Sequence, residues 1–153
     1  MRTMWRCVLL VLAAVGASAA AADGPGAPLQ ALRDGTVVSI VDGRTREAAV
    51  TLPYHWDRVH QGRPGEARFT LPFRMAETPT EPWGLFIPRV GSAFDVALNG
   101  HVLQTYGDLA RPHGADYAKA PIYLPIPAPQ LYPGENLLQI RIQIGRASCR
   151  ERV

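Results

Sequence analysis

The sequence predicts an all-β protein built as an antiparallel jelly-roll sandwich. The strongest indication lies between residues 83 and 103, where Phe94, Val96 and Leu98 alternate with Ala93, Asp95 and Ala97. This period-two pattern is typical of a strand with one buried face. The pair Asn99-Gly100 follows, and it suits a two-residue type I′ turn because both residues need a positive φ. Seven or eight short apolar or β-branched runs separated by turn residues complete the pattern.

The first 35 residues precede the predicted sandwich. Residues 1–22 have two arginines, an apolar core at 7–15 and small residues around a cleavage site, which together predict a secretory signal peptide. The apolar core is too short to span a bilayer. Residues 23–35 form a Gly- and Pro-containing lead-in. The domain is therefore expected to be exported and to lie on the periplasmic side of the inner membrane.

The predicted domain spans residues 36–143, and its first half contains three strands before the central hairpin. β-branched runs at 36–42 and 48–52 predict two strands joined by a turn at 43–47, and residues 59–66 are expected to be loop. Residues 67–75 alternate well, and Pro72 on the exposed side predicts an edge strand or a bulge. No segment after residue 22 shows a convincing helical period.

The second half begins with a long polar insertion at 106–119. Residues 122–126 predict a strand, and Pro133-Gly134 matches the centre of a type II turn because proline fixes the first φ and glycine supplies the positive second one. The last strand is expected at 137–143, with Leu138, Ile140 and Ile142 buried.

The last ten residues, 144–153 (IGRASCRERV), resemble the in-frame translation of a sequencing-library adapter. We therefore expect them to be an artefactual tail and the natural chain to continue differently after Gln143. Without residues 1–22 and 144–153, the chain has 11 Lys and Arg against 12 Asp and Glu, so its basic character vanishes and no nucleic-acid partner is expected. Both cysteines, Cys7 and Cys149, also fall in those termini, which excludes a disulfide framework in the domain.

Four ordered blocks of the sequence resemble the galactose-binding-like jelly roll. They are residues 52–57 (LPYHWD), 83–100 (WGLFIPRVG followed by FDVALNG at 94–100), 119–121 (KAP) and 131–138 (LYPGENLL). The arrangement is most similar to the version at the periplasmic N-terminus of bacterial seven-helix membrane sensors, which precedes a histidine kinase or a diguanylate cyclase. A second version is the sugar-binding domain of family 2 glycoside hydrolases.

The resemblance implies a periplasmic ligand-sensing domain truncated from a transmembrane signalling protein. Its ligand would be a carbohydrate or another small polar molecule, and its partner would be the missing membrane region of the same chain. Two alternatives stay open: an accessory sugar-binding domain of a secreted family 2 glycoside hydrolase, and a structural sandwich used for protein contacts. In each case any enzymatic activity belongs to the parent protein, and none is assigned to these residues.

Six residues are candidates for ligand binding. Trp83 can stack on a sugar ring or close one end of the core. Arg89 can bind a ligand carboxylate or pair of hydroxyls, or form an ion pair with Asp95 or Asp57. Asn99 is most simply the turn former. The other three lie in the polar insertion, because loops often bear function: His113, Asp116 and Lys119.

No residue pattern predicts catalysis, a metal or a cofactor. The four histidines lack the spacing of metal ligands, no pair of carboxylates is singled out, and neither a nucleophile elbow nor a phosphate-binding glycine loop is present. The sequence therefore favours a binding domain over an enzyme.

Overall fold

The computed structural model describes residues 29–91, 93–111 and 120–145, and the described residues from Ala31 onward form one compact unit. The predicted signal peptide lies outside the described residues, and so does most of the tail that the sequence analysis expects to be artefactual. Eight strands lie within these ranges: β1 Asp34–Val41, β2 Arg44–Thr51, β3 Gly65–Met75, β4 Trp83–Ile87, β5 Ala93–Leu98, β6 His101–Tyr106, β7 Ile122–Ile126 and β8 Gly134–Ile144. Two short helical turns accompany them, α1 Trp56–His60 and η3 Ala128–Gln130.

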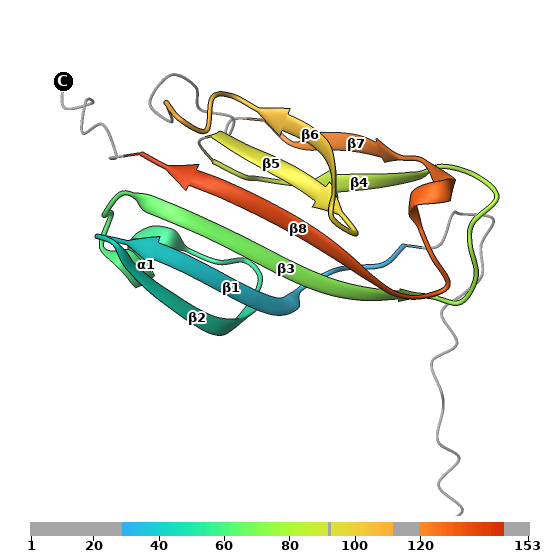
Figure 1. The fold of residues 1–153 in the computed structure, drawn as a ribbon, viewed down its shortest axis with the longest axis horizontal. Coiled ribbons are helices and arrows are strands. Elements are labelled where there is room, and N and C mark those ends of the chain that lie inside the picture. Colours follow the sequence, from blue (N-terminus) through green and yellow to red (C-terminus); the bar gives the residue numbers. More distant parts are fainter. Residues whose placement is uncertain (1–28, 92, 112–119, 146–153) are drawn as a thin grey trace, which may run out of the picture. The chain divides into compact units, whose positions relative to one another are not determined.

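The strands form two antiparallel sheets. The larger has six strands in the order β2-β1-β3-β8-β5-β6, and the smaller consists of β4 and β7 (Figure 1). Apolar side chains from both sheets share one core cluster, in which Leu85 and Ile87 of β4 and Leu124 of β7 pack with Phe69 and Phe94 of the large sheet. The predicted all-β sandwich is therefore confirmed. Two strands cover only part of a six-stranded face, and this mismatch in width leaves room for the cleft described below.

The two tightest turns both have the conformation expected of type I′ hairpins. Asn99 and Gly100 have φ angles of 51° and 84° and join β5 to β6, as the sequence predicts. Asp42 and Gly43, with φ angles of 51° and 73°, join β1 to β2 in the same way. The prediction of a turn at 43–47 is therefore wrong, because residues 44–47 already belong to β2. That stretch is exposed on both faces, so it lacks the alternation that marks a half-buried strand.

Strand β5 is buried on both faces rather than on one. All six residues are buried, including Ala93, Asp95 and Ala97, which were expected to face solvent. Their cross-strand neighbours on β8 have long polar side chains, namely Gln143, Arg141 and Gln139. Long side chains of this kind cover small residues beside them, so a central strand is shielded on its outer face without an apolar layer.

Two further expectations differ from the structure. Strand β3 is central, although Pro72 suggested an edge; its pairing with β1 ends at Thr70, so Pro72 has a neighbouring strand on the β8 side only. The segment expected as loop at 59–66 contains the end of α1 and the start of β3. A five-residue helix is shorter than two turns, so no helical period is visible in its sequence. Strand β8 extends to Ile144, which pairs with Gly65.

Candidate functional site

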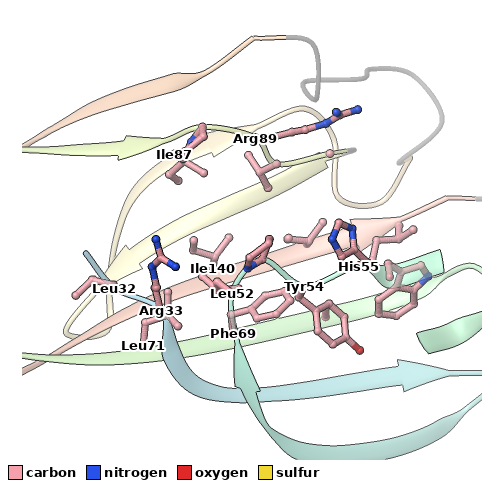
Figure 2. Close-up of a pocket in the computed structure, with 18 of the residues that line it drawn as sticks. Leu32, Arg33, Leu52, Tyr54, His55, Phe69, Leu71, Ile87, Arg89 and Ile140 are labelled. Atoms are coloured by element: carbon pink, nitrogen blue, oxygen red, sulfur yellow. The ribbon is translucent and has the colours of Figure 1, made fainter. Parts of the chain in front are cut away.

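A cleft of about 870 Å³ opens between the two sheets. One wall is the inner face of β3 and β8, and the opposite wall is the end of β4 together with the segment that follows it, residues 87–91. Residues 52–58, which leave β2 and enter α1, close one side. This volume lies within the usual range for a small-molecule site. The cleft is therefore the candidate site of the described part of the chain (Figure 2).

The wall of the cleft is apolar and its rim is cationic. Phe69, Leu71 and Ile140 lie on the large-sheet side. The charged lining residues are Arg33, Arg58, Arg89 and Asp57, so guanidinium groups outnumber carboxylates. Figure 2 shows the side chains of Arg33 and His55 directed into the space between the layers, with Arg89 on the opposite side. Such a combination offers an apolar contact surface next to donors that suit carboxylates and hydroxyls.

Arg89, which the sequence singled out, is an exposed residue of this rim. The ion pair expected with Asp95 is absent, because Arg141 holds that carboxylate: its Nε donates to Asp95 Oδ2 at 2.9 Å and its Nη2 donates to the same oxygen. Asp57 forms no ion pair with any described residue either. Among the described residues, Arg89 and Arg33 have no salt-bridge partner.

Three aromatic rings stiffen the side of the cleft formed by residues 52–58. The Trp56 ring lies 4.0 Å from the His60 ring, centroid to centroid, and its Nε1 donates to the Arg63 carbonyl at 2.7 Å. The Tyr54 hydroxyl lies 2.9 Å from His60 Nε2, and the Tyr54 ring contacts Phe69 edge-on at 5.4 Å. Trp56, which the sequence analysis did not select, is therefore fixed where its half-buried ring lines the cleft.

The environment of this cluster shifts two ionisation equilibria. Burial lowers the pKa of His60 from its usual 6.5, and the positive charges of Arg63 and Arg46 lower it further. Burial raises the pKa of Tyr54, and Arg46 opposes that rise. Both shifts favour the neutral forms, so the hydrogen bond between the Tyr54 hydroxyl and His60 Nε2 joins two uncharged groups. The cluster is thus an uncharged support for the cleft wall.

Two of the other predicted site residues, Trp83 and Asn99, are not in the cleft. Trp83 is half-buried and packs against a second core cluster of Leu98, Ile126 and Leu131, so it lies at one end of the core. The Asn99 amide donates to the Gln130 carbonyl and to Asn136 Oδ1, and its own Oδ1 accepts from the Leu137 amide. His113, Asp116 and Lys119 lie outside the described residues. The structure therefore does not bring Trp83, Arg89 and Asn99 together.

Sequence reasoning missed Arg33, His55 and Tyr54. Arg33 lies in the stretch assigned to the lead-in, and His55 was considered only as a metal ligand. The block 52–57 was noticed as a motif, and it does form one side of the cleft. Tyr54 and Trp56, which flank His55, were the only indication in the sequence that this segment packs against the core.

Two absences hold for the part of the chain that the structure describes. No group of three or more His, Cys, Asp or Glu residues is placed to hold a metal ion. No described helix is both long enough and apolar enough to cross a membrane.

Comparisons with known proteins show that the fold of this chain is similar to part of larger solved structures. No family model matches the sequence, and no curated protein matches it. Among solved structures, a β-D-glucuronidase from Dictyoglomus thermophilum is similar with a TM-score of 0.54 and 12% identity over 74% of this chain. An FMN-binding β-glucuronidase from Facaelibacterium prausnitzii L2-6 is similar with a TM-score of 0.55 and 14% identity over 80% of this chain. This chain spans 19% and 20% of those two chains.

Proposed function

We propose that this chain is an accessory carbohydrate-binding domain of a larger glycoside hydrolase, and that the cleft between its sheets binds the sugar. The observation that carries the proposal is the cleft itself, where apolar side chains face guanidinium groups that have no ion-pair partner among the described residues. An apolar wall suits the C–H face of a sugar ring, and guanidinium groups suit its hydroxyls or carboxylate.

The similarity to two β-glucuronidases supports the hydrolase context rather than a sensor. It is a likeness of fold over about a fifth of each enzyme, so the catalytic residues of the parent protein are expected outside this domain. The sensor interpretation suggested by the sequence blocks receives no such support. The domain's task is then to hold substrate or to orient it, with no proton transfer by its own residues.

A titration of the full chain with two matched sugars tests the binding proposal. The cationic rim predicts tighter binding of methyl β-D-glucuronide than of methyl β-D-glucoside, which has the same ring without the carboxylate. Isothermal titration calorimetry measures both affinities. Arg89→Ala is expected to weaken binding of the glucuronide about tenfold, because it removes a charge-assisted hydrogen bond.

Arg74→Ala is the matched control, since Arg74 is an exposed arginine of β3 that neither lines the cleft nor forms a salt bridge with a described residue. It should bind both sugars like the unchanged protein. The proposal is contradicted if methyl β-D-glucuronide does not bind, or if both Arg89→Ala and Arg33→Ala bind it with the affinity of the unchanged protein.

The context of the domain is tested separately, by sequencing the source gene through and beyond the codon for Gln143. A reading frame that continues into a soluble (β/α)₈ pattern agrees with the hydrolase. About seven apolar segments of roughly twenty residues each would instead show the membrane sensor.

A further inference from the structure

The outer face of the small sheet presents two exposed aromatic rings. In β4, Trp83, Leu85 and Ile87 point toward the core, so Gly84 and Phe86 point outward. In β7, Tyr123 and Pro125 point outward in the same way. Phe86 is 60% exposed and Tyr123 is 68% exposed, although large apolar side chains on a sheet usually find cover. We call these four residues the outer platform.

The strand register places the four residues of the outer platform side by side. Phe86 is the cross-strand partner of Tyr123, and Gly84 is the partner of Pro125. Directly opposite residues on one face of an antiparallel pair have Cβ atoms about 5 Å apart, so the two aromatic side chains are neighbours.

Gly84 gives the platform its flatness. A Cβ atom built on Gly84 would overlap the ring and the hydroxyl of Tyr123, so the Tyr123 ring lies across the glycine rather than standing away from the sheet. Only glycine leaves room for a ring in that position. The Tyr123 hydroxyl lies over Gly84, and the residue as a whole is 68% exposed.

The size of the outer platform decides what kind of partner fits. Full burial of a Phe or Tyr side chain covers about 200 Å². The exposed parts of these two rings therefore amount to roughly 250 Å², well below the about 800 Å² that each partner contributes to a stable protein interface. A patch of this area is too small for a stable dimer. It matches one or two six-membered rings laid flat.

We propose that the outer platform is a second binding site, which stacks on pyranose rings of a β-linked glucan chain. When the ring hydroxyls are equatorial, both faces of a pyranose present C–H groups, and these make apolar contact with an aromatic face. A β-linked glucan repeats that flat ring along an extended chain. The site is distinct from the cleft, because Leu85 and Ile87 face the cleft side of β4 while Gly84 and Phe86 face outward.

Affinity gel electrophoresis of the full chain tests the proposal, with hydroxyethyl cellulose as the β-linked glucan and dextran as an α-linked control. The glucan is expected to retard the unchanged protein, and dextran is not. Tyr123→Ala and Phe86→Ala should each weaken retardation about tenfold, because each removes half of the stacking surface. Tyr123→Phe should keep most of it, since the ring remains.

Gly84→Ala tests the placement of the Tyr123 ring most directly, because it keeps both aromatic residues and only displaces that ring. It should lose retardation while its unfolding midpoint stays unchanged, since the displaced ring is exposed and free to turn away. Val102→Ala is the matched control: Val102 is 63% exposed on β6 and lies outside the platform. It should migrate like the unchanged protein.

Three outcomes would overturn the proposal. The first is an unchanged protein that the glucan does not retard. The second is retardation that survives in both Tyr123→Ala and Phe86→Ala. The third is a sedimentation-velocity experiment that finds a dimer which dissociates in these variants, because the platform would then be a self-association surface. Sugar binding in the cleft is measured with monosaccharides and Arg89→Ala, so failure of one site leaves the test of the other intact.

Discussion

Replacing Asn99 by glycine separates its two possible roles, ligand contact and structural support. The Asn99 side chain makes three hydrogen bonds, to the Gln130 carbonyl at 3.0 Å, to Asn136 Oδ1 at 2.9 Å and from the Leu137 amide at 2.9 Å. Asn136 is fully buried, so water does not replace these partners readily. At about 1 kcal/mol of net stability for each bond, their loss should cost about 3 kcal/mol.

Asp42→Gly is the matched control for Asn99→Gly. Both residues occupy the first position of a two-residue hairpin turn with a φ of 51°, so the change in backbone freedom is the same in both variants. The Asp42 side chain makes an ion pair with Arg63 at 3.1 Å, and both partners are more than half exposed. An exposed pair of this kind contributes about 0–1 kcal/mol. The difference between the two variants should therefore be about 2–3 kcal/mol.

Urea unfolding monitored by tryptophan fluorescence measures both free energies, and calorimetry measures sugar binding in parallel. We expect Asn99→Gly to be clearly less stable than Asp42→Gly while its affinity for methyl β-D-glucuronide is unchanged. If the two variants differ by less than about 1 kcal/mol, the hydrogen-bond argument is refuted. If sugar affinity falls at unchanged stability, Asn99 is the ligand contact that the sequence analysis considered.

Three further predictions concern stability. Asp95→Asn should destabilise the fold by about 1–2 kcal/mol in urea unfolding, because it removes the buried negative charge that faces the Arg141 guanidinium, whereas Asp108→Asn at an exposed pair should be nearly neutral. The folded state lowers the pKa of His60 below the unfolded 6.5, so the contribution of His60 to the free energy of unfolding should be fully present above pH 6.5. The free energy of unfolding should fall as the pH drops below 6.5, and it should fall less in His60→Gln. Gly35→Ala should cost about 2 kcal/mol or more by thermal unfolding, because its Cβ would overlap the Thr70 carbonyl oxygen.

The sequence predicts the elements whose pattern depends on local chemistry. The β5–β6 hairpin follows from Asn99-Gly100, since a two-residue turn has few solutions and these residues fit one of them. β2 was recognised only in its second half, because the first half of an edge strand has both faces in solvent and shows no alternation. α1 is too short to show a period. Burial of Asp95 depends on Arg141, which lies 46 residues away, so it is invisible to any local pattern.

The candidate site is less predictable for the same reason. Arg89 was recognised because it follows Pro88 at the end of an apolar strand, and it does lie at the cleft. Arg33 reaches the cleft only because β1 pairs with β3 and so places the preceding residues beside the inner face of the large sheet. Asn99 has a side chain that suits a ligand, yet the pairing of β5 with β8 supplies it with protein partners instead.

Strand β4 connects the two proposed sites through its alternation. Its odd-numbered residues face the core and the cleft, and its even-numbered residues form half of the outer platform. A shift of one residue in the pairing of β4 with β7 would put Phe86 inside and Leu85 outside, so both sites depend on the same register. Gly84 adds a second constraint, because any side chain there would displace Tyr123 without disturbing the core. A glycine on the exposed face of a two-stranded sheet costs stability, and its place here is explained by the ring that lies across it.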